Sequence, residues 1–210
     1  MKLVGLTGGI GMGKTAASDY LVRRGEAVID TDVLARNLVA PGELALREIV
    51  QAFGSGVLNP DGTLDRRTLA TAVFTSQAKR KALEAILHPR IRKAWKDWAE
   101  HLRSAGCARA VVVIPLLFET GAENEFDLTV CVGALPATQS RRLTQRGWSE
   151  GEINTRTAAQ LPIREKLERS DRVVWNEYSL QVLEGQINRI FSIPELPPAS
   201  EAGGAMVSPF

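Results

Sequence analysis

The stretch that decides the fold is MKLVGLTGGIGMGKTAASDYLVRRG, residues 1–25. Five glycines lie between positions 5 and 13, and a run of helix-forming residues follows them directly. Glycine loses more backbone freedom on folding than any other residue, so such a cluster lowers stability unless the loop needs its conformations. The apolar residues before the cluster predict a buried strand over 2–7, and the residues after it predict a helix over 15–24.

The glycine cluster fits the pattern G-x-x-x-x-G-K-[ST] of a phosphate-binding loop. A phosphate chain needs many donors converging in a small volume, and backbone N–H groups supply them where side chains are absent. The amino end of the following helix adds its amides and its positive dipole end. Lys14 is predicted to bridge the β- and γ-phosphates, and the Thr15 hydroxyl to hold Mg²⁺. The residues of the loop predicted to bind the nucleotide are Gly8, Gly9, Gly11, Met12, Gly13, Lys14, Thr15 and Ala16.

The first helix and the strand after it predict a βαβ unit. Ala17, Leu21 and Val22 supply an apolar stripe, and Gly25 is expected to end the helix in a left-handed conformation. A short strand is predicted over 27–30, followed by a polar turn at 31–32. Such a strand, loop, helix and strand form a right-handed unit of a parallel sheet.

Two carboxylates follow the second strand, Asp30 and Asp32. At the carboxyl end of a strand beside the phosphate loop, a carboxylate can accept the proton of an attacking hydroxyl or hold a metal through water. The other interpretation is that both cap a helix that begins near Val33. We take Asp32 as the candidate general base, and the division of base and metal roles between the two residues stays open.

The rest of the chain divides into further segments. Residues 33–104 are predicted to be mostly helical, with breaks at 41–42, 54–56, 59–62 and 88–89, so we expect an inserted helical subdomain. Strands are predicted over 110–114, 127–132 and 172–175, and a closing helix over 180–191. Pro136 is expected to begin a helix, and Ser149 with Glu152 to form a capping box. Residues 193–210, rich in proline, glycine and alanine, are predicted to be a flexible tail.

The segment 139–169 is predicted to be a small helical lid. Phosphoryl transfer to a small acceptor requires exclusion of water, and a mobile basic lid over the phosphates provides it. Its arginines are Arg141, Arg142, Arg146, Arg156 and Arg164. The fold class is therefore α/β, a doubly wound parallel sheet with a phosphate loop, a helical substrate-binding insertion and a lid. The core is expected to comprise 1–32, 108–138 and 170–192, and the insertion 33–107.

Composition limits the classes of function. A net charge of +2 argues against a protein built mainly to bind nucleic acid, and no obligate protein partner is evident. Cys107 and Cys131 fit neither a metal site nor a disulfide framework, and Cys131 in an apolar run is expected to be a buried thiol. No export signal and no stretch long enough to span a membrane is evident, so a cytoplasmic location is expected. The chain also lacks the N-K-x-D segment with which switch GTPases read guanine.

Several motifs together are more specific than the phosphate loop alone. They include LTGGIGMGKT (6–15), VIDTDVLAR (28–36), APGELAL (40–46), FG (53–54), DGTLDRRTL (61–69), VF (73–74), LHPRIR (87–92), IPLLFE (114–119) and RTAAQLP (156–162), together with Gln139, Arg142 and Arg146. In this combination, which runs from about residue 3 to residue 176, the chain resembles the dephospho-coenzyme A kinase family. Met12 and Thr15 stand where that family commonly has serine, and VVWNEYS (173–179) replaces its more usual Asp-Asn-Gly turn.

The resemblance implies transfer of the γ-phosphate of ATP, with Mg²⁺, to the ribose 3′-hydroxyl of dephospho-coenzyme A. It implies that Asp32 is the general base, that Arg142 lies on the ATP phosphates and that Asn176 lies on the nucleotide side. It also places Arg66, His88 and the turn Pro115, Leu116 and Leu117 near the acceptor.

Alternatives to these assignments remain. His88 before a proline could end a helix, the PLLFE segment could be packing at a strand end, and Arg66 could belong to a charged helix start. A kinase for another nucleotide or small alcohol, or a regulatory protein that cycles on slow hydrolysis, are the rival functions.

Overall fold

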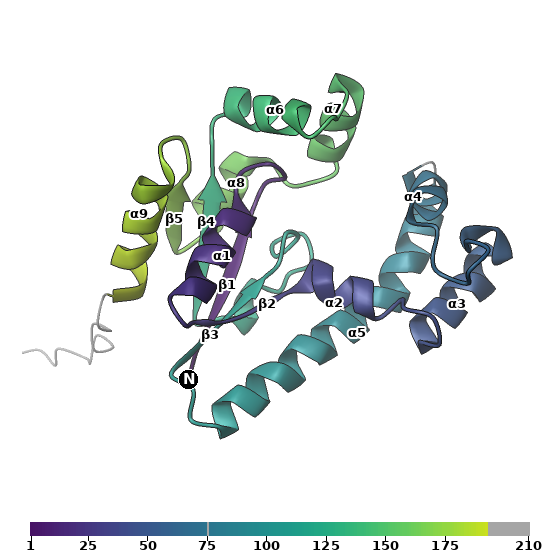
Figure 1. Cartoon of the computed structure of the whole chain (residues 1–210), viewed down its shortest axis with the longest axis horizontal. Coiled ribbons are helices and arrows are strands. Elements are labelled where there is room, and N and C mark those ends of the chain that lie inside the picture. Colours follow the sequence, from purple (N-terminus) through teal and green to yellow (C-terminus); the bar gives the residue numbers. More distant parts are fainter. Residues whose placement is uncertain (75, 193–210) are drawn as a thin grey trace, which may run out of the picture.

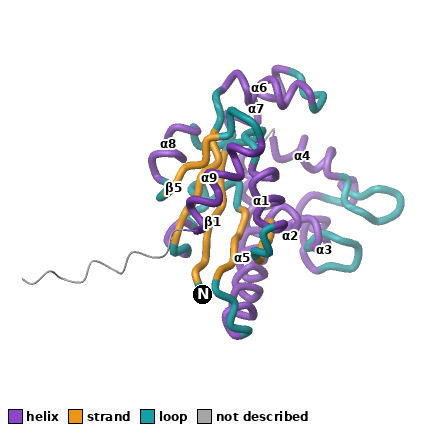
Figure 2. The backbone as a smooth tube through the Cα atoms, turned by 60° about the vertical axis from the view of Figure 1, so that its left-hand side comes forward, coloured by secondary structure: helices purple, strands orange, loops and turns teal. Residues whose placement is uncertain are grey.

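The computed structural model describes residues 1–74 and 76–192, and the predicted tail at 193–210 lies outside the described residues. Five parallel strands form one sheet in the order β2-β3-β1-β4-β5, running side by side along the molecule (Figure 2). The strands are β1 (Lys2–Gly8), β2 (Ala27–Asp30), β3 (Arg109–Val113), β4 (Leu128–Gly133) and β5 (Arg172–Trp175). The predicted α/β class is confirmed, and each predicted strand exists within one residue at either end.

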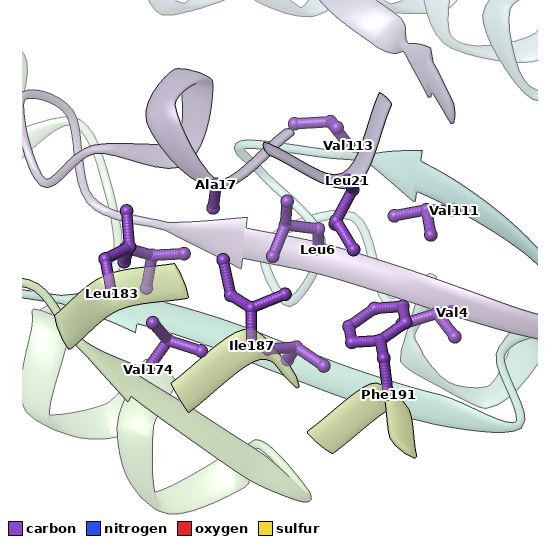
Figure 3. Packing of buried hydrophobic residues seen from close by; sticks show 12 residues of the cluster. Val4, Leu6, Ala17, Leu21, Val111, Val113, Val174, Leu183, Ile187 and Phe191 are labelled. Carbon is purple, nitrogen blue, oxygen red and sulfur yellow. The ribbon is translucent and has the colours of Figure 1, made fainter. Parts of the chain in front are cut away.

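Helices cover both faces of the sheet. On one face lie α1 (Lys14–Arg23) and α9 (Leu180–Ser192), which contact each other and the strands (Figure 1). Their apolar side chains interdigitate with those of the strands, and Leu21, Leu183 and Ile187 are almost fully buried there (Figure 3). On the other face, α5 (Gln77–Ser104) packs on β3 and α8 (Ile163–Arg169) packs on β1 and β4. Burial of apolar area on both faces explains why the central strands β1, β3 and β4 are mostly apolar.

Between β2 and β3 the chain is helical over residues 31–104, in the region where the sequence predicts an insertion over 33–107. Its helices are α2 (Thr31–Asn37), α3 (Leu44–Phe53), α4 (Arg66–Phe74) and α5, with the short 3-10 helix η1 (Ser55–Val57). Buried residues from α3, η1 and α4, such as Ile49, Val57 and Leu69, form a cluster separate from the core around the sheet. The insertion extends to one side of the sheet in Figure 1.

The predicted break at residues 88–89 is wrong, because α5 is one continuous helix of 28 residues with Pro89 inside it. Proline removes one backbone donor from a helix and its ring crowds the preceding turn. Packing holds α5 together despite this, since the helix contacts α2, α3, α4 and β3 along its length. The Arg90 guanidinium also donates to the carbonyl of Ile86, one turn earlier, over 2.6 Å. His88 therefore does not end a helix.

Two further predictions near α1 need correction. Val22 is 56 % exposed and lies off the buried stripe, whereas Ala17 and Leu21 are buried as predicted. The polar turn expected at 31–32 is instead the first turn of α2, because the Asp30 side chain caps that helix by accepting from the Asp32 N–H over 2.7 Å. Gly25 does end α1, with φ of 83°.

Three helices lie between β4 and β5, where the sequence predicts a helix beginning at Pro136 and a capping box at Ser149. They are α6 (Pro136–Gln145), α7 (Glu150–Ala158) and α8. Pro136 begins α6, and the capping box of Ser149 and Glu152 is present at the start of α7. In Figure 1, α6 and α7 lie above the carboxyl ends of the strands, whereas α8 packs on the sheet. In the part of the chain that the structure describes, no helix is both long and apolar enough to cross a membrane.

Candidate active site

The loop between β1 and α1 follows the carboxyl end of the central strand. The sheet order reverses between β1 and β3, and ligands of open α/β sheets bind in the crevice beyond such a point. Gly13 has φ of 102°, and a β-carbon there would lie 1.9 Å from Asn176 Nδ2. A β-carbon on Gly8 would lie 2.3 Å from the Val132 carbonyl oxygen. The loop thus needs glycine both for its curl and for its close approach to neighbouring elements.

The side chain of Lys14 folds back onto the start of this loop. Its ammonium donates to the carbonyl oxygens of Gly8 over 2.9 Å and Gly9 over 3.1 Å. Burial, and next the positive charge of Lys166, lower the pKa of Lys14 to about 8, against the opposing effects of Asp32 and Asp30. An anion in the loop would supply the countercharge that this ammonium lacks.

Asp30 and Asp32 stand at the carboxyl end of β2, and Thr31 between them anchors the turn by donating to the Val113 carbonyl over 2.9 Å. Asp30 caps α2, which is the structural role that the sequence left open for it. Desolvation of the carboxyl group, and next the charge of Asp30, raise the pKa of Asp32 above its ordinary value, while Lys14 opposes the shift. A carboxylate with a raised pKa is a better proton acceptor than an ordinary one.

Two residues from distant segments contact the loop at one carbonyl. Asn176, at the end of β5, donates from Nδ2 to the Met12 carbonyl over 2.9 Å. Arg142 on α6 donates to the same carbonyl over 3.5 Å and to the Asn176 carbonyl over 2.9 Å. The structure therefore brings together three residues predicted to act on the nucleotide. Met12 itself is buried, with its sulfur against Gly9.

Two glutamines hold the tip of the loop from both ends of the α6–α7 segment. Gln139 on α6 donates from Nε2 to the Ile10 carbonyl over 2.7 Å. Gln160, just after α7, accepts the Ile10 N–H at Oε1 over 2.9 Å. The sequence motifs contain both glutamines, but nothing local in the sequence indicates that both side chains bind the backbone of the same loop residue, Ile10.

Glu177 is a further residue that the sequence did not single out. Its carboxylate accepts from the Leu135 N–H and, over 2.8 Å, from the Thr138 hydroxyl, so it caps the amino end of α6. These hydrogen bonds, the one from Leu135 first, lower the pKa of Glu177. The segment 173–179, which departs from the family's usual turn, thereby orients the helix that carries Arg142.

The residues predicted to lie near the acceptor do not all fall in one place. Pro115 and Leu116 form the half-buried turn after β3, at the same edge of the sheet as the phosphate loop. Leu117 is fully buried beneath Gly5 of β1, so its role is packing under that turn. Arg66, exposed at the start of α4, and His88, half-buried on α5, belong to the insertion. In the described residues, no hydrogen bond or ion pair joins either of them to the phosphate loop.

A magnesium ion with nucleotide phosphates fits the donors at this site. Thr15 is the second residue of α1 and is exposed. Among the residues described, no group of three or more His, Cys, Asp or Glu side chains could hold a metal ion. Mg²⁺ at kinase sites is held by one or two protein oxygens together with substrate phosphates and water, so one hydroxyl beside the loop matches that donor set. Asp30 and Asp32 are the carboxylates electrostatically coupled to Lys14 beside it.

Known proteins share this sequence over nearly its whole length. A family model for dephospho-CoA kinase matches residues 2–181. The dephospho-CoA kinase of Anaeromyxobacter dehalogenans is 41% identical over 208 residues, which cover 94% of this chain and 99% of the relative. That of Geobacter sulfurreducens is 43% identical over 193 residues, covering 91% of this chain and 98% of the relative.

Solved structures resemble the fold. The crystal structure of TT1252 from Thermus thermophilus aligns with a TM-score of 0.79 at 34% identity, covering 91% of this chain and 96% of that one. Dephospho-CoA kinase from Campylobacter jejuni aligns with a TM-score of 0.68 at 24% identity, over 90% of this chain and 95% of that one. The resemblance read from the motifs is confirmed: the chain belongs to the dephospho-CoA kinase family.

Proposed function

We propose that this protein transfers the γ-phosphate of ATP to the ribose 3′-hydroxyl of dephospho-coenzyme A, giving coenzyme A and ADP, the last step of coenzyme A biosynthesis. The observation that carries the proposal is a phosphate loop with a raised-pKa carboxylate beside it, in a chain that matches the family over residues 2–181. The loop accounts for the donor, and the carboxylate accounts for an alcohol as the acceptor.

In the reaction, a bond forms between the acceptor's 3′-oxygen and the γ-phosphorus, and the bond from that phosphorus to the β,γ-bridging oxygen breaks. Asp32 accepts the proton of the 3′-hydroxyl. Lys14, whose ammonium lies at the Gly8 and Gly9 carbonyls, binds the β- and γ-phosphates, and the loop amides hold the remaining oxygens. Arg142 stabilises the charge that spreads over the transferred group. Catalysis is then mostly positioning and charge stabilisation.

The Thr15 hydroxyl would hold Mg²⁺, which would supply positive charge to neutralise the nucleotide phosphates. Ala16 contributes its backbone amide at the first turn of α1, and Asn176 holds the loop from the nucleotide side.

We assign three parts to this chemistry. The sheet with α1, α8 and α9 binds the nucleotide, and the insertion, with Arg66 and His88, binds the coenzyme A precursor together with Pro115 and Leu116. The lid is α6 and α7, which span 136–158 in place of the predicted 139–169, because α8 packs on β1 and β4. A cytoplasmic location fits two cysteines that are both free thiols, since thiols stay reduced there.

The test is ADP release by the purified protein with MgATP, measured with and without dephospho-coenzyme A. We expect ADP release to depend on the acceptor and the product to be heavier by one phosphate. Lys14→Ala controls for a contaminating kinase, because its ADP release should fall by orders of magnitude. ADP release that is unchanged by dephospho-coenzyme A but stimulated by a nucleoside monophosphate would show that the acceptor is wrong.

A further inference from the structure

Lys166 on α8 is a charged side chain with 0 % exposure, and it has no role in the mechanism above. Lysine is almost never fully buried unless its charge is paired. Its ammonium donates to Glu119 Oε1 over 2.7 Å and to the Pro115 carbonyl oxygen over 2.8 Å. The sequence carried one signal of this burial, since helical spacing puts Lys166 on the same face as Ile163 and Leu167.

The Pro115 carbonyl links three elements of the fold. Pro115 follows β3 in the chain, and its carbonyl oxygen accepts hydrogen bonds from Lys166 of α8 and, over 3.3 Å, from the hydroxyl of Thr7 near the end of β1. Thr7 is fully buried and directly precedes the phosphate loop. The turn assigned to the acceptor is therefore tied to the strand that leads into the donor's loop.

Glu119 extends the same connection toward the lid. Its Oε1 also accepts the Leu161 N–H over 2.9 Å, and Leu161 follows Gln160, which binds Ile10 at the tip of the loop. The other oxygen of Glu119 is buried and has no hydrogen-bond partner among the described residues. Lys166 is thus the charge that balances Glu119, and it connects the acceptor turn with the segment that follows the lid.

We propose that Lys166 is a positioning residue for phosphoryl transfer: its ammonium holds the acceptor turn at Pro115 in register with the phosphate loop. The inference rests on the proposed function, since it concerns the alignment of acceptor and donor. A misplacement of reacting groups by about 1 Å can lower a rate about 100-fold. Loss of this one hydrogen bond should therefore weaken use of the acceptor much more than binding of ATP.

The test separates this role from a purely structural one. Lys166→Met alone leaves Glu119 buried without its countercharge, which destabilises a fold strongly. The variant to measure is Lys166→Met with Glu119→Gln, which removes both charges while the amide oxygen introduced by the second change can still accept from the Leu161 N–H. Thr7→Val is the second variant, because it removes only the other donor to Pro115. Glu165→Gln, an exposed charge on the same helix, is the matched control.

Melting temperature and the kinetic constants for each substrate are measured for all four proteins. We expect the double variant to melt within a few degrees of the wild type, with kcat/KM for dephospho-coenzyme A at least tenfold lower. The KM for ATP should stay within about twofold at pH 7, because Lys14, with a pKa of about 8, is mostly charged at that pH even before the charge of Lys166 is removed. Thr7→Val should lower the same constant severalfold, and Glu165→Gln should match the wild type.

Three results would overturn the inference. One is a double variant with wild-type acceptor kinetics, and another is an equal loss of kcat/KM for both substrates. If the double variant does not fold, the third is a Thr7→Val protein with unchanged acceptor kinetics. A wild type without acceptor-dependent ADP release would instead overturn the proposed function itself, and the inference with it.

Discussion

The side-chain amide of Asn176 occupies the space that a β-carbon on Gly13 would take, with Nδ2 only 1.9 Å from that position. The amide uses this space to donate to the Met12 carbonyl. Asn176, which follows the last strand β5, thus fits into the phosphate loop that follows the first strand β1. The absence of a side chain at Gly13 makes this fit possible. The loop motif alone therefore does not describe the site, because a partner more than 160 positions away completes it.

Gly13→Ala should lower the affinity for ATP at least tenfold, measured as Kd by calorimetry. The new β-carbon would displace Asn176, and alanine is strained at φ of 102°. Gly25→Ala is the matched control: this glycine also has positive φ, 83°, but nothing lies within 4 Å of its would-be β-carbon. It should cost about 1 kcal/mol of stability from backbone strain and leave ATP binding unchanged. Equal ATP affinities of the two variants would contradict the role of the Asn176 contact.

Asp32→Asn should lower kcat by about 10²–10⁴, the usual contribution of a general base, while the protein stays folded. Asp30→Asn is the comparison, because asparagine caps a helix as well as aspartate does. Its kcat should stay within severalfold of the wild type. If Asp32→Asn kept most of its turnover, the assignment of the base would be wrong.

The electrostatic coupling of Asp30 and Asp32 also predicts how the activity depends on pH. The pKa of Asp32 lies above its ordinary value of 3.8, partly because of Asp30, and the base must be ionised to act. Activity should therefore fall as pH drops through that raised pKa. Asp30→Asn removes a negative charge, so its acid limb in kcat/KM should move to lower pH. A limb that moves to higher pH or stays in place would contradict this coupling.

ATP binding at pH 8 should take up protons. Because the pKa of Lys14 is about 8 in the free protein, roughly half of its side chains are neutral at that pH, and bound phosphates favour the charged form. The uptake should approach half a proton at pH 8 and shrink as pH falls below 7. Calorimetry in buffers of different ionisation enthalpy measures it. Lys14→Arg, which stays charged, should lack this part of the uptake, and an equal uptake in both proteins would contradict the lowered pKa.

Pro89→Ala should stabilise the fold by about 1–2 kcal/mol, because alanine restores a backbone donor and removes a ring from the middle of α5. For a domain of this size the melting temperature should rise by roughly 2–8 °C. Ala85→Gly, one turn earlier and exposed, is expected to lower the stability by about 1 kcal/mol. A melting temperature that falls in Pro89→Ala would show that the packing of α5 requires the proline.

Local patterns predicted much of this molecule. The apolar run before the glycines, the helix after them, the strand ending at Asp30 and the capping box at Ser149 are all present, because each depends on neighbours in the sequence. Pro89 shows the limit of that reasoning, since the packing of α5 on four elements outweighed a local breaker.

The contacts that complete the site were harder to predict. Gln139 and Gln160 meet at Ile10, and Lys166 meets Pro115, only after the chain has folded. Glu177 lies in a segment that departs from the family pattern, so its cap on α6 had no motif to indicate it. Residue types and spacing identified the chemistry at the loop, but not the polar network that holds it in place.

The measurement that tests the central claim most directly is ³¹P NMR of the product formed from MgATP and dephospho-coenzyme A. We predict one new phosphate monoester, coupled to the ribose 3′-proton, in an amount equal to the ADP released. ADP without a new monoester, or a phosphate attached at any other oxygen, would contradict the assignment of this site to the 3′-hydroxyl of dephospho-coenzyme A.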